Sequence, residues 1–193
     1  MLLMEILADY KQIFGIMHLF GVVVGFGAAI VADFLFFRFV SNFKLSNSEL
    51  HVMGLVSGLV WAGLSLILVS GFLLFLTDTE LYLNSSKFLI KMFVVIVITI
   101  NGSFLHFYVK PRLKMIDWKS KTPGEGRKIR KLAFAAGAIS FNSWLLAMVL
   151  GSLKSIPLDI DAAVLFYVCF LLVLILISQC AEIFYSRYII KNL

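Results

Sequence analysis

The stretch that decides the fold runs from Ile13 to Arg38 and reads IFGIMHLFGVVVGFGAAIVADFLFFR. An α-helix of about 20 apolar residues spans the hydrocarbon core of a bilayer, so this stretch is long enough to cross one. It carries His18 near its start and Asp33 near its end, and ionisable groups are costly inside a membrane. Small residues and the aspartate recur at four-residue spacing, on one helix face: Gly21, Gly25, Ala29 and Asp33. A simple anchor needs none of these features, so the stretch predicts a transmembrane helix that takes part in function.

Composition extends this prediction to the whole chain. The 193 residues are 61% hydrophobic and have a mean hydropathy of +0.99, whereas soluble domains are nearer half apolar. Continuous apolar runs of this length cross a membrane only as helices. We therefore expect an all-α, polytopic membrane bundle that forms a single domain. Its five transmembrane helices are expected at about 13–40, 52–76, 87–109, 132–153 and 162–186.

The distribution of positive charge predicts the orientation. The net charge of +6 would suggest a nucleic-acid partner in a soluble protein, but here the basic residues report topology because cytoplasmic loops are enriched in Lys and Arg. Thirteen basic residues fall on one side of the spans, nine of them between Lys110 and Lys131, and four fall on the other. We expect the N-terminus outside, the C-terminus in the cytoplasm and a basic cytoplasmic loop at 110–131. The expected surroundings are the lipid bilayer of the cell (inner) membrane, with no nucleic-acid partner.

Depth in the membrane sorts the ionisable residues into an outer and an inner layer. His18 and Lys91 form the outer layer, because each lies about one helical turn inside a span that starts outside. Gly21, Gly25 and Gly102 provide small-residue surfaces where a flat ring or another backbone could approach. Together these features predict a planar cofactor, with His18 as the metal ligand. Taken singly, His18 could instead bond a neighbouring helix, and Lys91 could extend toward the headgroups.

The inner layer holds polar residues of several spans: Asp33, Asn101, His106, Gln179 and Glu182. Opposite charges in this layer could pair, Asp33 or Glu182 with Arg38 or Arg187. Two interpretations stay open for this layer. One is a network of hydrogen bonds and ion pairs that pins the helices together. The other is a path for protons or small cations that starts at the cytoplasm.

The three histidines do not suit a single site. His18 and His106 lie near opposite ends of their spans, roughly 20 Å apart in depth by helical rise, so they cannot both bind one haem iron. A pair must lie within one layer, either His18 with Lys91 or His51 with His106. The two cysteines, Cys169 and Cys180, share one span and sit about 16 Å apart along it, too far to form a disulfide.

Spans one to three resemble a known family. IMHLFGVVVGFGA resembles the opening motif of the HemJ-type protoporphyrinogen oxidases and of the related CopD-like membrane proteins. SGLVWAGLSLILVSGFLL is similar to their second span, and FLIKMFVVIVITINGSFLHF to their third, whose Lys precedes a long aliphatic run. The likeness covers about residues 10–112. It implies a four- or five-span bundle that binds b-type haem through His18, with Lys91 as second ligand or propionate partner, and an oxidoreductase of the HemJ type.

The sequence also departs from that family. HemJ-type chains continue span one with Pro-Arg-Leu and a further His, whereas this chain reads ADFLFFRF and contains Asp33. The departure bears on porphyrinogen oxidation more than on haem binding. CopD-like members are linked to copper passage, for which the outer end offers only Met4, Met17 and His18. The catalytic residues stay unknown.

Two other functions stay open beside a haem redox protein. A proton or small-cation (metal) transporter or channel would use the inner layer. A structural membrane subunit, as a homo-oligomer or with a partner membrane subunit, would pack a helix on the stripe around Gly25. The chain contains no GxSxG, HExxH or P-loop motif, so nothing in it indicates a hydrolase or a nucleotide enzyme.

Overall fold

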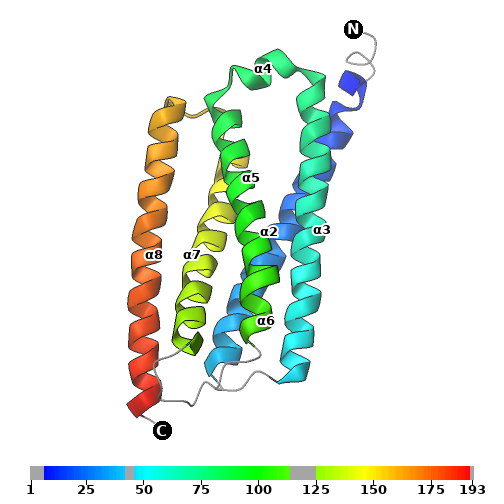
Figure 1. Ribbon diagram of the computed structural model, residues 1–193. Helices are drawn as coiled ribbons and strands as arrows, with labels where there is room; N and C mark the ends of the chain where they lie inside the picture. Colours follow the sequence, from blue (N-terminus) through cyan, green and yellow to red (C-terminus); the bar gives the residue numbers. More distant parts are fainter. Residues whose placement is uncertain (1–6, 42–45, 114–124, 192–193) are drawn as a thin grey trace.

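A computed structural model describes residues 7–41, 46–113 and 125–191. In these ranges the chain forms helices and no strand, and five helical segments are long and apolar enough to cross a membrane. The helices run up and down the bundle (Figure 1). Their bounds are α2 Lys11–Ser41, α3 Asn47–Thr77, α4 Thr79–Leu83, α5 Ser86–Phe104, η1 Leu105–Val109, α6 Lys110–Leu113, α7 Glu125–Ser152 and α8 Ile160–Lys191. The expected all-α bundle of five membrane-crossing helices is confirmed.

The two ends of the bundle are distinct. α2 begins at the end that also carries α4, called the N-terminal end below, and α8 ends at the opposite, C-terminal end (Figure 1). An odd number of crossings requires this arrangement. The assignment of the C-terminal end to the cytoplasm stays a prediction from the basic residues.

Local sequence signals explain where the helices begin. Ser46 caps α3 through a capping box, in which its Oγ accepts from the Glu49 N–H at 3.2 Å and its own N–H donates to Glu49 Oε2 at 2.7 Å. Ser85 caps α5 by accepting from the Phe88 N–H. The helices extend into the expected loop at 110–131, because α6 continues to Leu113 and α7 begins at Glu125. The expected spans end where the apolar runs meet charged residues, whereas the helices continue past these residues. Positions 114–124 of the loop lie outside the described residues.

The third crossing contains one turn of π-helix, η1, between α5 and α6. A π turn widens the helix locally, and such turns are frequent at functional sites. The sequence LHFYV showed no sign of it, since no Pro or paired Gly interrupts the run. His106 lies in this turn, so the irregular backbone carries an ionisable residue of the inner layer.

Small residues let α2 and α3 pack closely. A β-carbon on Gly21 would lie 3.0 Å from the Ile67 side chain, and one on Gly63 would lie 2.5 Å from the Gly25 Cα. A β-carbon on Gly25 would lie 2.6 Å from the Trp144 ring of α7. The stripe on span one is therefore filled within one chain by α3 and Trp144. The stripe packs helices of the same chain against one another. The sequence had suggested that Gly21 and Gly25 admit a ring or a partner helix, and the structure does not leave them open to either.

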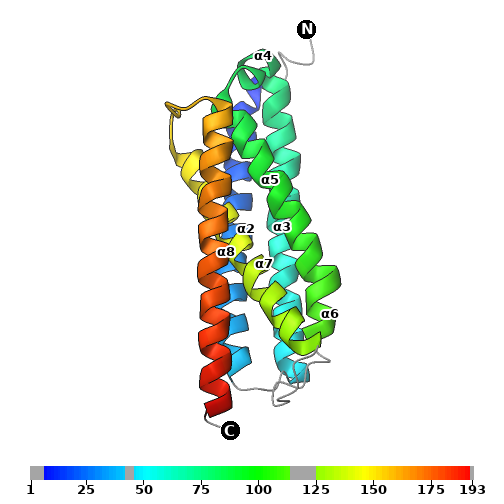
Figure 2. The same ribbon diagram turned by 60° about the vertical axis from the view of Figure 1, so that its left-hand side comes forward.

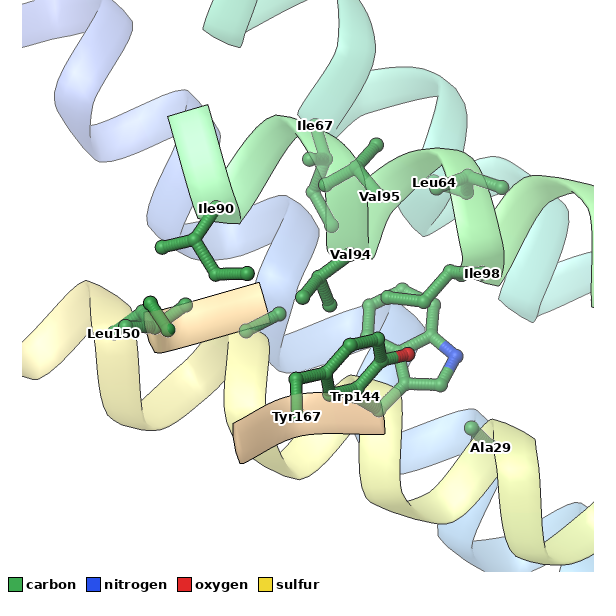
Figure 3. Packing of buried hydrophobic residues seen from close by; sticks show 12 residues of the cluster. Ala29, Leu64, Ile67, Ile90, Val94, Val95, Ile98, Trp144, Leu150 and Tyr167 are labelled. Atoms are coloured by element: carbon green, nitrogen blue, oxygen red, sulfur yellow. The ribbon is translucent and has the colours of Figure 1, made fainter. Parts of the chain in front are cut away.

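The buried core occupies the middle of the bundle. Large apolar side chains from α3, α5, α7 and α8 meet there, with Trp144 and Tyr167 beside Val94 (Figure 3). A second cluster near the C-terminal end joins η1 and α6 to α7 through Val109, Leu113 and Ile129. α8 lies along one side of the bundle (Figure 2), and many of its large apolar side chains face outward. That exposure suits a helix in contact with lipid.

Candidate functional site

His18 and Lys91 meet in the N-terminal half of the bundle. His18 Nε2 lies 3.5 Å from Lys91 Nζ, and His18 Nδ1 lies 3.2 Å from Ser70 Oγ on α3. The side chain of Ser70 is buried and also donates to the Leu66 carbonyl at 2.5 Å. The structure thus brings together the two residues that the depth argument paired, and it adds a third.

The order of donors in this cluster follows from side-chain chemistry. A lysine ammonium group can only donate, so His18 Nε2 accepts from Lys91. His18 then carries its proton on Nδ1 and donates it to Ser70 Oγ, while the Ser70 hydroxyl donates to the Leu66 carbonyl. Both ring nitrogens are held, which fixes the orientation of the imidazole. Gly71, the residue after Ser70, leaves room for the imidazole, since a β-carbon there would lie 3.2 Å from His18 Cε1.

A cavity of about 130 Å³ lies in the C-terminal half, between α2, α3, the third crossing and α7. Its walls are mostly apolar, with the indole rings of Trp61 and Trp144 among them. Its polar and ionisable lining residues are Asp33, Ser57, His106, Lys110 and Ser140. Gly102 and Gly137 also line it. The sequence had placed Gly102 with the outer cofactor site, but in the structure it lines this cavity in the C-terminal half.

His106 is held at the wall of this cavity by α3. Its Nδ1 lies 3.1 Å from Ser57 Oγ, and its ring stands edge-on to Trp61, at 6.4 Å between centroids and 87° between planes. The exposed His51 lies instead on a neighbouring hollow with Gly54 and Lys110. The structure therefore separates His51 from His106, and the alternative histidine pair of the inner layer has no support in these contacts.

The other residues of the inner layer hold helices together. Asn101 donates to the Ala136 carbonyl at 2.9 Å, and Gln179 donates to the Lys131 carbonyl at 3.1 Å. Glu182, which is 0% exposed, pairs with Arg130 at 2.7 Å. The sequence had offered Arg38 or Arg187 as its partner; the partner in the structure is Arg130, which the sequence had assigned to a loop. The side chain of Arg187 lies outside the described residues.

Comparisons with protein-family profiles, curated proteins and solved structures find no match for this chain. Function is therefore inferred from the geometry of its own residues. Among the described residues no group of three or more His, Cys, Asp or Glu side chains could hold a metal ion. Cys169 and Cys180 are exposed on α8.

His18 and Lys91 bring into one cluster two nitrogen atoms of kinds that can bind haem iron. His18 Nε2 and Lys91 Nζ lie 3.5 Å apart, within hydrogen-bond range of each other. The second ring nitrogen of His18 is held by Ser70, as is usual for a ligating histidine. Gly21 and Gly25 are covered by α3 and Trp144, so the ring of a haem would not lie over them.

Proposed function

We propose that the protein is an integral membrane redox protein that binds b-type haem through His18 in the N-terminal half of the bundle. The observation that carries the proposal is the close approach of His18 Nε2 to Lys91 Nζ, with the imidazole oriented by Ser70. The likeness of spans one to three to HemJ-type proteins, which rests on short motifs around His18 and Lys91, supports the same assignment. The cell membrane and an oxidoreductase activity of the HemJ type are parts of this proposal.

The residues would have separate roles. His18 would be the axial ligand through Nε2, Lys91 the second ligand or the partner of a propionate, and Ser70 the group that fixes the imidazole tautomer. The haem would supply one-electron transfer. The surrounding helices contribute a setting of low polarity, because the neighbouring core residues Ile67 and Ile90 are buried. Low polarity and the identity of the axial ligands are two of the means by which a protein tunes a haem potential.

An absorption spectrum tests this proposal directly. The protein is expressed with haem supply, purified in detergent and examined for a Soret band and for reduced-state bands. We expect the bands in the wild type and in His51→Ala, and their loss in His18→Ala. His51 is the matched control because it is exposed and distant from Lys91 in the fold. A colourless wild type, or a His18→Ala variant that keeps the full spectrum, would contradict the proposal.

A second candidate function is a path for protons or small cations in the C-terminal half. Asp33 and His106 line one cavity there, whereas Asn101, Gln179 and Glu182 are engaged in contacts between helices. Of the residues expected to form a proton or cation path, Asp33 and His106 therefore still line a cavity. Flux into liposomes should fall in Asp33→Asn and stay unchanged in Asp161→Asn, which removes an exposed carboxylate of α8. Equal flux in the wild type and Asp33→Asn would end this candidate.

A further inference from the structure

The cavity in the C-terminal half is a site apart from His18. Buried apolar residues of the core lie between the two, including Ile67, Val94 and Val95. The cavity and the His18 cluster share no lining residue. A ligand in the cavity therefore contacts other side chains than a ligand at His18 would. Binding in the cavity does not depend on whether the protein binds haem.

Asp33 is the residue that the fold leaves unexplained. It lies in a membrane-crossing helix, partly buried, and lines the cavity. Among the side chains that the structure describes, those of residues 7–38, 46–113 and 126–184, none donates a hydrogen bond to its carboxylate, and the ion pair found among them joins Arg130 to Glu182. Its Oδ1 rests against Gly137, where an added β-carbon would be 3.7 Å away. A carboxylate held in an apolar region is costly unless it takes up a proton or meets a positive charge, so a cation that enters the cavity would be stabilised by Asp33.

The residues that line the cavity favour an organic cation over a metal ion. Calcium and magnesium ions take six or more oxygen ligands, and the cavity offers Asp33 with two serine hydroxyls among mostly apolar side chains. Trp61 and Trp144 line it as well, and aromatic rings, tryptophan best, attract weakly hydrated organic cations. Lys110 reaches the same cavity, but its Nζ lies near Gly54, 3.4 Å from where a β-carbon there would be, and it has an interaction of its own. The Lys110 ammonium group thus lies at the side of the cavity that α3 forms, one helical turn from Ser57 toward the C-terminal end of the bundle.

Size narrows the choice further. A cavity of about 130 Å³ is close to the roughly 150 Å³ cavity that is known to hold one benzene molecule. It is smaller than the roughly 300–1,000 Å³ of sites for drug-sized ligands. A cation with one to four methyl groups on nitrogen is of the right order, and a long-chain amine would have to leave its tail outside.

We infer that this cavity binds a small organic ammonium cation, with Asp33 as counter-ion and Trp61 and Trp144 as aromatic walls. The π turn η1 serves the site by bringing His106 against Trp61, which orients the indole ring. This inference concerns binding alone. It requires neither haem at His18 nor flux across the membrane.

Binding is measured on the full chain purified in lipid nanodiscs. Tetramethylammonium chloride and methylammonium chloride are titrated while tryptophan fluorescence and calorimetric heat are recorded, with sodium chloride at equal ionic strength as the salt control. We expect saturable binding of at least one ammonium probe and none of sodium. Asp33→Asn, which keeps the shape of the side chain, should weaken binding at least tenfold because the counter-charge is lost.

Three further variants separate the site from the rest of the protein. Gly102→Leu should abolish binding by filling the cavity, since a β-carbon there already lies 3.9 Å from Trp61. Asp161→Asn and Glu80→Gln, which remove exposed carboxylates of α8 and α4, should bind as the wild type does, within about twofold. Gel filtration and melting curves establish that each variant is folded. Absence of saturable ammonium binding in the wild type, or equal affinity in the wild type and Asp33→Asn, overturns the inference. The haem proposal is decided separately by the spectrum of the same preparations.

Discussion

The replacement of Gly63 by alanine tests the close packing of α2 on α3. The added β-carbon would lie 2.5 Å from the Gly25 Cα, whereas ordinary van der Waals contact at such positions is 3.4–4 Å. The atom it meets belongs to the backbone, so no side-chain rotation relieves the contact. The two helices must separate by roughly 1 Å, and overpacking of this kind costs about 1–3 kcal/mol.

The matched control for this variant is Gly58→Ala on the same helix. A β-carbon at Gly58 meets nothing within 4 Å, and the residue is exposed. Both variants gain the same helix propensity from alanine, so the difference between them reports packing alone. Unfolding is followed in mixed micelles against the fraction of sodium dodecyl sulfate.

The expected result is an unfolding equilibrium constant for Gly63→Ala that exceeds that of Gly58→Ala by roughly 5- to 150-fold. Gly58→Ala should match or exceed the wild type in stability. If the two variants unfold at the same detergent fraction, α2 and α3 are not packed through Gly25 and Gly63. The assignment of the glycine stripe to packing within one chain would then be wrong.

Three other predictions follow from contacts of single residues. Ser70→Ala should speed the transfer of haem to a scavenging apoprotein by about 10- to 100-fold while the haem absorption bands stay visible, because the imidazole of His18 loses its orienting partner. An unchanged transfer rate would contradict this, and His18→Ala serves as the reference for complete loss of haem. Arg130→Met should destabilise the protein by about 3–5 kcal/mol by leaving Glu182 buried without its partner, and the double variant with Glu182→Leu should recover most of that loss. Ser46→Ala should cost about 1 kcal/mol in the same detergent titration through loss of the cap on α3, and no shift of the midpoint would show that the capping box contributes nothing.

Much of the fold could be predicted because a membrane reduces the choices. Five apolar runs can only be helices, and their lengths are set by the thickness of the bilayer. Depth along a helix is also a linear quantity, so His18 and Lys91 could be paired by counting residues. The caps at Ser46 and Ser85 were local signals of the same kind.

The candidate sites were less predictable, because they depend on which helix faces which. Arg130 could not be found as the partner of Glu182, since hydropathy assigned it to a loop rather than to α7. Trp61 and Trp144 come from helices that are not consecutive, and no periodicity in either span shows that they line one cavity. The π turn at His106 rotates the following residues of the third crossing, and nothing in LHFYV marks it.

The sequence by itself determined that this protein is a bundle of five membrane-crossing helices, because burial of backbone polar groups in lipid leaves one solution for apolar runs of this length. Counting residues along the helices also paired His18 with Lys91, which the structure brings together. Only the tertiary structure decided what the span from Ile13 to Arg38 uses its small residues for, since Gly21 and Gly25 could have faced a ring, a partner or the same chain. They face α3 and Trp144, because the lateral packing of helices depends on the matching of side-chain shapes across the whole bundle.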